Sequence, residues 1–189
     1  MLDLIESFKL LKKLPVAEYK IVSEKDLEFE YPAFMKISTG EHKTELGGVK
    51  KCINKEDALQ NYKEMRKKFK GKIVLQRAAE GKEMIIGIKE DAVFGKLLLV
   101  GFGGIDADIL RDISFRALPV DKQEIEKMIK ELKMYPVLVT RKKYAVDKFI
   151  DLAEQVSEIA EKLKIAEMDL NPVILTETQA VIVDARIIL

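Results

Sequence analysis

The chain has 189 residues, enough for one substantial hydrophobic core or for two small lobes. Hydrophobic residues make up 48% and charged residues 34%, typical of an ordered protein, and the net charge of +1 without a long basic run predicts binding to neither nucleic acid nor an anionic membrane. A single cysteine, Cys52, excludes an internal disulfide framework, and the absence of a signal-peptide pattern or a long apolar span leads us to expect a cytoplasmic protein without a membrane segment.

The first part of the chain alternates between helical and extended patterns. Apolar residues at helical spacing predict an N-terminal helix, and the apolar positions after Asn54 predict another. In chain order we expect a helix ended by Pro15, strands at 19–22, 33–37 and 49–53, and a helix between Asn54 and Gly71.

The remaining chain predicts strands first and helices afterwards. Four strands are expected at 72–78, 83–89, 96–102 and 113–118. They precede a helix that starts with the capping pair Asp121 and Glu124, a loop at 135–144, a long helix and a terminal hairpin. With no repeat and no linker, the expected class is α+β, with a first lobe at 1–72 and a second at 73–189 that meet near Gly71.

The terminal hairpin gathers polar residues on an otherwise apolar pair of strands, 168–173 and 183–186. If the chain folds back about residues 177–178, Asn171 falls opposite Asp184, and Asp169 falls opposite Arg186. Polar residues two apart share one face of a strand, and opposed residues have Cβ atoms about 5 Å apart. Such oxygen ligands suit Mg²⁺, which completes its shell with substrate phosphates. The alternative is an exposed polar hairpin face.

A lysine, Lys36, stands in an otherwise apolar strand and is followed by a polar loop that reaches Val49. A buried lysine needs an anionic partner or a route to water, and snorkelling from the strand end is the simple alternative. The loop contains the paired glycines Gly47 and Gly48, which allow backbone amides to approach an anion, and the sole histidine, His42. His42 is either a solvated loop residue or part of a phosphate or nucleophile site.

Two further features carry an open interpretation. Glu83 lies in an apolar strand and is either a ligand contact or an edge residue. The cluster Gly101-Phe102-Gly103-Gly104 follows another strand, and a tight turn would also explain it. The three-glycine nucleotide fingerprint and the Gly-Lys-Ser/Thr loop are absent.

Taken in order, these motifs resemble the nucleotide-binding β subunit of the ADP-forming acetate–CoA ligases, also called NDP-forming acyl-CoA synthetases. That subunit is an ATP-grasp domain related to the β subunit of succinyl-CoA synthetase. The resemblance runs from about Pro15 to Leu189 and is strongest at 31–37, 42–49, 81–83, 101–105, 112–116 and the terminal hairpin. It implies an acid–thiol ligase with the ATP-grasp fold, in which two α/β lobes hold the nucleotide between them.

The resemblance also implies which residues meet the nucleotide. A strand lysine would hold the ATP phosphates, and the paired glycines would form the phosphate loop. The hinge would meet adenine through backbone groups, and a glutamate would line the pocket. The residues assigned in this way are Lys36, Gly47, Gly48, Gln76, Arg77, Ala78 and Glu83.

For catalysis, the resemblance implies that Asn171 and Asp184 bind Mg²⁺ and that Arg186 neutralises phosphate charge. His42 matches the histidine proposed in this family to relay a phosphoryl group. In such enzymes a CoA-binding α subunit supplies another histidine, which is phosphorylated by the acyl phosphate, and the phosphoryl group then passes to ADP. We therefore expect a hetero-oligomer with a CoA-binding α subunit that uses Mg²⁺ and ATP or ADP.

Some positions depart from the family pattern. Arg77 stands where the family usually has an acid, Asp108 replaces the usual glutamate, and the loop at 138–143 lacks the typical glycine-rich form. Two alternatives therefore stay open: a non-catalytic nucleotide-binding or assembly subunit, and another ATP-grasp carboxylate ligase that works through an acyl phosphate without phosphohistidine.

Overall fold

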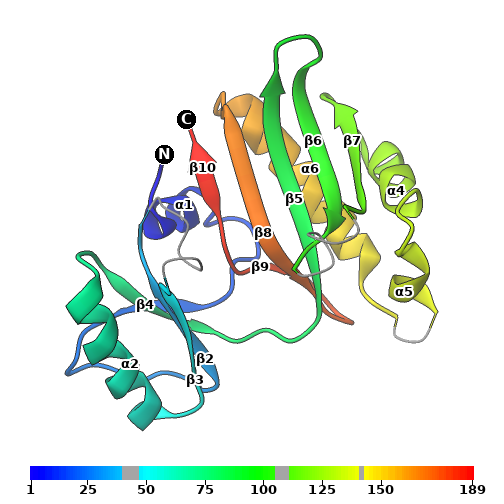
Figure 1. Ribbon diagram of the computed structural model, residues 1–189. Coiled ribbons are helices and arrows are strands. Elements are labelled where there is room, and N and C mark those ends of the chain that lie inside the picture. The colour runs from blue at the N-terminus through cyan, green and yellow to red at the C-terminus, as the bar shows by residue number, and fades with distance from the viewer. Residues whose placement is uncertain (40–46, 105–110, 141–142) are drawn as a thin grey trace. The chain divides into compact units, whose positions relative to one another are not determined.

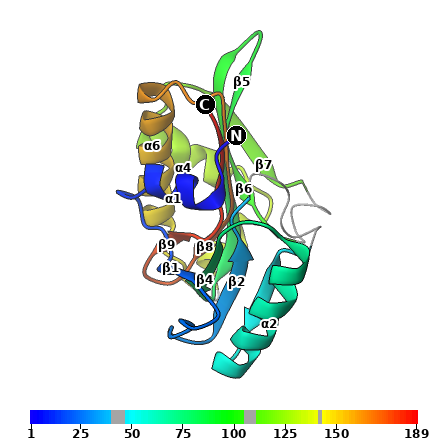
Figure 2. The same cartoon turned by 90° about the vertical axis from the view of Figure 1, so that its left-hand side faces the viewer.

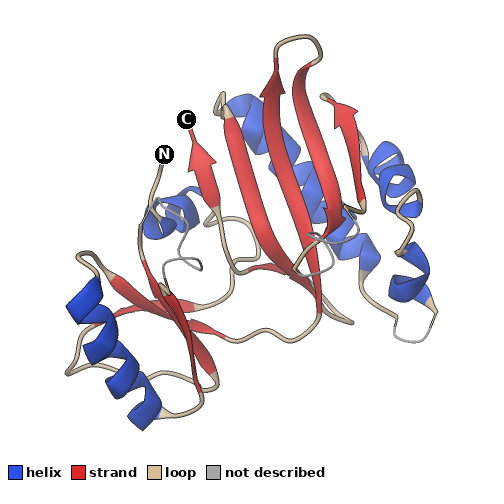
Figure 3. Cartoon of the chain, in the orientation of Figure 1, coloured by secondary structure: helices blue, strands red, loops and turns tan. Residues whose placement is uncertain are grey.

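The computed structural model describes residues 1–39, 47–104, 111–140 and 143–189, so the predictions for His42 and Asp108 lie outside the described residues (Figure 1). Helices and antiparallel sheets are mixed along the chain, which confirms the α+β class (Figure 3). The chain divides into two compact units. The smaller unit comprises Leu2–Leu10 and Ala17–Ala79, and the larger comprises Met1, Leu11–Val16 and Glu80–Leu189.

The smaller unit is built on a four-stranded antiparallel sheet in the order β1-β4-β2-β3. Its strands are β1 (Tyr19–Val22), β2 (Ala33–Ile37), β3 (Val49–Cys52) and β4 (Ile73–Arg77), and its helices are α1 (Leu4–Leu10) and α2 (Lys55–Lys68). We expected the lobes to meet between residues 72 and 73, but the compact units divide the chain between Ala79 and Glu80. The reason is that β4 pairs with β1 and β2 of the smaller sheet.

A different helix packs on each face of the smaller sheet. The side-chain oxygen of Asn54 accepts the N–H of Asp57 at 2.8 Å and starts α2, whose apolar stripe packs on one face. On the other side of the sheet, the ring of Phe8 in α1 contacts the ring of Tyr19 at 5.0 Å between centroids. The buried cluster on the α2 side includes Ala33, Met35, Ile37, Ala58, Tyr62, Met65, Ile73 and Leu75.

The larger unit is built on a six-stranded antiparallel sheet in the order β10-β8-β5-β6-β7, with β9 paired to β8. Its strands are β5 (Lys82–Asp91), β6 (Gly95–Phe102), β7 (Ile113–Ala117), β8 (Glu167–Leu175), β9 (Ala180–Ile182) and β10 (Arg186–Ile188). Its helices are α4 (Lys122–Lys130), α5 (Tyr135–Val139) and α6 (Val146–Lys162).

Helices α4 and α6 lie on one face of the larger sheet (Figure 2). Along β5, Met84, Ile86 and Ile88 are buried, whereas the alternate residues Ile85 and Gly87 are only half-buried. This alternation is expected of a sheet with one covered face and one open face. The open face carries the polar residues that the sequence singled out.

One expected loop is partly helical. Residues 135–139 form α5 inside the stretch that we predicted as a loop at 135–144. The cause lies earlier in the chain, because the buried carboxylate of Asp112 accepts the N–H groups of Lys133 and Met134, both at 2.8 Å. These two hydrogen bonds fix the backbone where α5 begins.

Candidate functional site

The terminal hairpin has the register that the sequence predicts. Asp169 in β8 is paired with Arg186 in β10, and Val173 is paired with Ile182 in β9. Both pairs belong to one continuous alignment, in which Asn171 and Asp184 occupy the corresponding positions. The prediction of a continuous strand at 183–186 was wrong, because residues 183–185 lie outside β9 and β10. There the carboxylate of Asp184 accepts the N–H of Ala185 at 2.9 Å, a local bond that competes with strand pairing.

A β-bulge lies beside Asn171. The pairing of β5 with β8 shifts by one residue between Met84 and Ile86, so that Asn171 and Pro172 together face Ile85. Bulges of this kind are frequent next to active sites, where they redirect a side chain. Asn171 is exposed, and in the alignment of the hairpin it lies opposite Asp184.

Charged side chains continue along the hairpin from these two residues. A guanidinium nitrogen of Arg186 lies 3.5 Å from Oε1 of Glu167, and its Nε lies 3.2 Å from Sδ of Met1. The Arg186 side chain is 34% exposed, so an anion can reach it from solvent. Asp169 is paired directly across from it and is only half-buried.

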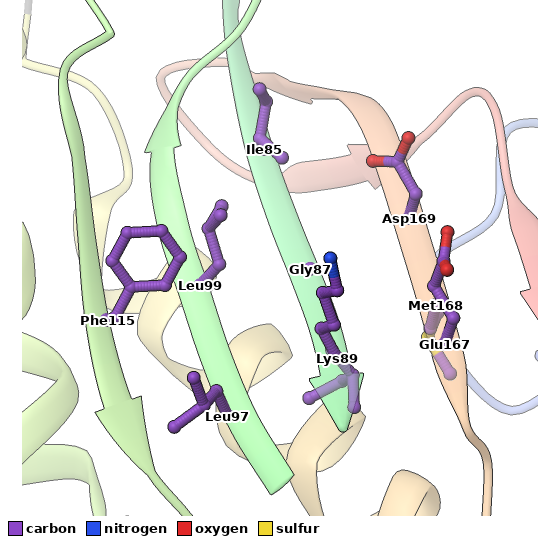
Figure 4. Close-up of a pocket in the computed structure, with 10 residues that line it drawn as sticks. Ile85, Gly87, Lys89, Leu97, Leu99, Phe115, Glu167, Met168 and Asp169 are labelled. Atoms are coloured by element: carbon purple, nitrogen blue, oxygen red, sulfur yellow. The ribbon is translucent and has the colours of Figure 1, made fainter. Parts of the chain in front are cut away.

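Two of these residues, Glu167 and Asp169, line a cavity of about 220 Å³ on the larger sheet (Figure 4). Apolar side chains from β5, β6 and β7 form much of its lining, and charged side chains of β5 and β8 stand at one side. Asp169 belongs both to this lining and to the polar row of the hairpin. The lining includes Ile85, Gly87, Leu97, Leu99, Phe115 and Asp169.

The described residues contain no group of three or more His, Cys, Asp or Glu side chains placed to hold a metal ion. A site at Asn171 and Asp184 would therefore combine one amide oxygen with one carboxylate. That small set of hard oxygen donors fits Mg²⁺, which keeps several waters or substrate oxygens as ligands.

In the smaller unit, Lys36 and Gln76 lie on the same face of the sheet. Their neighbours Met35 and Leu75 belong to the cluster packed on α2, so alternation turns Lys36 and Gln76 to the other side. Both are buried, Lys36 at 6% exposure and Gln76 at 1%. Neither Nε2 nor Oε1 of Gln76 has a hydrogen-bond partner among the described residues.

Two backbone N–H groups of the expected hinge already have partners within the smaller unit. The N–H of Arg77 already donates to the carbonyl of Glu18 at 2.9 Å, and the N–H of Ala78 donates to that of Pro32 at 3.2 Å. The buried amide of Gln76, by contrast, has no hydrogen-bond partner within the described part of the chain. Its place in an apolar strand was a visible signal, but our sequence interpretation used only the backbone.

Arg77, the departure from the family pattern, points into solvent. Its guanidinium forms an ion pair with Glu30 at 2.7 Å, and its side chain is 52% exposed. Gly47 has φ +71, a conformation that favours glycine. The carbonyl of Gly48 accepts the N–H of Ile37 at 3.0 Å, which ties the paired glycines to the end of the lysine strand.

Each unit therefore gathers its own set of the predicted residues. Glu83, Asp169, Asn171, Asp184 and Arg186 belong to the larger unit, and Lys36, Gly47, Gly48, Gln76, Arg77 and Ala78 belong to the smaller one. His42 lies outside the described residues.

Comparison with known proteins places this arrangement in a family. Residues 6–189 match the model of the ATP-grasp domain. The chain is 34% identical to the β subunit of ADP-forming acetate–CoA ligase I from Pyrococcus furiosus, over 93% of this chain and 85% of the relative. It is 35% identical to ADP-forming acetate–CoA ligase II from Archaeoglobus fulgidus, over 85% of this chain but only 25% of the relative.

A solved structure shares the fold over nearly the whole length. The dinucleotide-forming acetyl-coenzyme A synthetase 1 of Candidatus Korarchaeum cryptofilum is 33% identical and matches with a TM-score of 0.84, over 98% of this chain and 91% of that chain. That protein was solved with coenzyme A and Mg-AMPPCP, its phosphohistidine segment pointing towards the nucleotide-binding site. The predicted ATP-grasp fold and family resemblance are confirmed. The chain belongs to the ATP-grasp family, among relatives that include the β subunits of ADP-forming acetate–CoA ligases.

Proposed function

We propose that this chain is the nucleotide-binding subunit of an ADP-forming acyl-CoA ligase, in which a phosphoryl group passes between a phosphohistidine and ADP or ATP. The observation that carries the proposal is the terminal hairpin, where Asn171, Asp184 and Arg186 stand in one register on an ATP-grasp sheet. Oxygen donors for a cation and a guanidinium for an anion are the groups that a metal–nucleotide complex needs.

Asn171 and Asp184 would hold Mg²⁺, and the bound ion would neutralise part of the phosphate charge. Arg186 and the buried Lys36 would bind phosphate oxygens, and a buried lysine favours such an anionic ligand because ionic contacts offset its desolvation. The amide of Gln76 would meet the base. Glu83, in the larger unit, would line the nucleotide pocket.

His42 would carry the phosphoryl group in transit. Its neutral imidazole nitrogen would attack the phosphorus of an incoming phosphohistidine, and the P–N bond of the donor would break as a new one forms. A terminal oxygen of ADP would then attack the phosphorus, His42 would leave as the imidazole, and ATP would form. Each transfer conserves the phosphoryl group.

The partner would be a CoA-binding α subunit. The Pyrococcus relative is itself named as a subunit, whereas the chain spans a quarter of the longer Archaeoglobus relative. Both facts support a ligase in which this domain works together with other domains. In a hetero-oligomer, a separate subunit would supply those other domains. None of the described helices has the length and apolar composition needed to cross a membrane. We place the complex in the cytoplasm.

One observation favours a second candidate, a non-catalytic nucleotide-binding or assembly subunit. Arg77 replaces a family acid at the hinge and pairs with Glu30 instead. A chain that had lost turnover would still be expected to bind nucleotide through the residues that it keeps. Another ATP-grasp carboxylate ligase would form an acyl phosphate without needing a histidine in the 40–48 loop.

The test is phosphoryl transfer by the complex reconstituted with its natural CoA-binding partner. ATP formation from ADP, phosphate and an acyl-CoA is measured with Mg²⁺ present, for the wild type and for Asp184→Asn. Asp147→Asn serves as the matched control, because that carboxylate is 73% exposed in the first turn of α6. We expect loss of turnover in Asp184→Asn alone. A wild-type complex that binds Mg-ADP without turnover would favour the non-catalytic subunit, and full activity of Asp184→Asn would refute the metal assignment.

A further inference from the structure

The carboxylate of Glu83 lies against the bare α-carbon of Gly104. A Cβ atom built on Gly104 would overlap Oε2 of Glu83 and lie 3.0 Å from its Cδ and 3.7 Å from its Cβ. The three nearest heavy atoms thus all belong to one side chain. Gly104 also has φ +64, so its backbone adopts a conformation that favours glycine.

The backbones of these two segments are joined beside this contact. The last pair of the β5–β6 ladder is Met84 with Phe102, and the N–H of Gly103 then donates to the carbonyl of Glu83 at 2.9 Å. The glycine loop is therefore fixed to the strand that carries Glu83. What remains adjustable is the direction of the Glu83 side chain.

The Glu83 carboxylate has no hydrogen bond or ion pair within the described part of the chain, and the residue is exposed. Among the described residues, the contact that Glu83 makes here is therefore one of shape with Gly104 and not one with a polar partner. An ionised carboxylate only accepts hydrogen bonds and repels phosphate. It is suited to the hydroxyl and N–H donors of a nucleoside, whereas Arg186, farther along the sheet, is suited to the phosphates.

We infer that Gly104 is a positioning residue, whose missing side chain lets the Glu83 carboxylate lie where it receives the nucleoside part of the nucleotide. This inference rests on the proposed function, in which Glu83 lines the nucleotide pocket. A larger residue at position 104 displaces the flexible end of Glu83 and leaves the sheet unchanged. The defect is therefore one of ligand binding, beyond the backbone strain that any non-glycine residue brings there.

The chain offers a matched control for that strain. Gly95 has φ +71 at the other end of β6, and a Cβ atom built there meets nothing within 4 Å. Gly95→Ala and Gly104→Ala therefore impose similar backbone strain, but only the second displaces a carboxylate. A difference in Mg-ADP affinity between Gly95→Ala and Gly104→Ala therefore measures the effect of displacing the Glu83 carboxylate.

The experiment measures Mg-ADP affinity and thermal stability of the full chain for Gly104→Ala, Gly95→Ala, Glu83→Ala and the double variant Glu83→Ala/Gly104→Ala. We expect Glu83→Ala and Gly104→Ala each to weaken Mg-ADP binding about tenfold, and Gly95→Ala to leave it unchanged. The double variant should bind as Glu83→Ala does, because two substitutions that remove the same contact are not additive. Mg-pyrophosphate, which lacks the nucleoside, should bind all four variants like the wild type.

Additive losses in the double variant, or wild-type affinity in Gly104→Ala, would overturn the inference. If Gly104→Ala fails to fold, the double variant should fold, because it lacks the side chain that clashes, and an equally unfolded double variant would also overturn it. Unchanged affinity in Glu83→Ala would remove Glu83 from the pocket and the inference with it. Failure of the proposed function has a different signature: the wild type would bind no Mg-ADP if nucleotide binding fails, or would bind it without turnover if only catalysis fails, and the second outcome leaves this inference standing.

Discussion

Replacing Gln76 by leucine is expected to stabilise the ligand-free chain while weakening nucleotide binding. The residue is 1% exposed, and both polar atoms of its amide lack hydrogen-bond partners among the described residues. Leucine removes both polar atoms and keeps an apolar side chain of similar bulk. The substitution thus separates what the amide costs in folding from what it contributes to binding.

The magnitude follows from the cost of burying an unpaired polar group, about 1–3 kcal/mol for each. Repacking around a changed side-chain shape offsets up to about 1.5 kcal/mol of this gain. The expected net stabilisation is therefore about 2 kcal/mol, which corresponds to a rise of about 4–8 °C in Tm for a chain of this size. Loss of the hydrogen bonds to the base should weaken nucleotide affinity about tenfold, or about 1.4 kcal/mol.

The assay compares Tm without ligand and Mg-ADP affinity for the wild type and Gln76→Leu. Gln155→Leu is the control, because Gln155 is exposed on α6 and its Nε2 already donates to the carbonyl of Asp151 at 3.0 Å. That control should show no gain in stability and no loss of affinity. A lower Tm for ligand-free Gln76→Leu would refute the reasoning about the unpaired amide, and unchanged Mg-ADP affinity would refute its role at the base.

Three further predictions concern separate parts of the chain. His42→Ala should abolish ATP formation in the reconstituted complex while Mg-ADP binding stays intact, with loss of an acid-labile phosphate on this chain; near-normal turnover would make His42 a bystander. Asp112→Ala should lower the free energy of unfolding by about 3 kcal/mol in urea titrations, because two backbone N–H groups lose a charged acceptor. The Arg116 guanidinium lowers the pKa of Glu124 and of Glu131 below the ordinary value of 4.5, so the stability that these pairs give is present above that pH and is lost as pH falls through the lowered values. Arg116→Met should therefore flatten the acid side of the curve of Tm against pH, and an unchanged curve would show that the pairs contribute nothing.

The terminal hairpin shows how much a local pattern predicts. Alternation with a period of two and a short turn fixed the pairing of Asp169 with Arg186, because a slip of one residue would have moved the apolar side chains to the open face. The interruption around Asp184 escaped prediction, since it depends on one side-chain hydrogen bond to the next residue. The bulge at Asn171 depends on β5, a strand that lies far earlier in the chain.

Features set by distant partners were predicted less well. We expected the lobe boundary near Gly71, but the pairing of β4 with β1 and β2 keeps residues up to Ala79 in the smaller compact unit. The start of α5 depends likewise on the carboxylate of Asp112, twenty-one residues before Lys133. Neither the strand pairing of β4 nor the hydrogen bonds of Asp112 can be predicted from the residues next to the element that they stabilise.

The same distinction explains which parts of the candidate site the sequence revealed. Residue type and spacing disclosed the groups that would bind a cation and phosphates, because oxygen donors and cations in apolar strands are conspicuous. Two features became apparent only with the fold. The amide of Gln76 lacks hydrogen-bond partners among the described residues. Gly104 leaves space that the Glu83 side chain occupies. Both features destabilise the ligand-free chain: one is a buried amide without a hydrogen-bond partner in the described part of the chain, and the other is a glycine at positive φ. Selection for stability alone would replace both features. Their presence, one at the residue proposed to meet the base and the other beside Glu83, is therefore best explained by nucleotide binding.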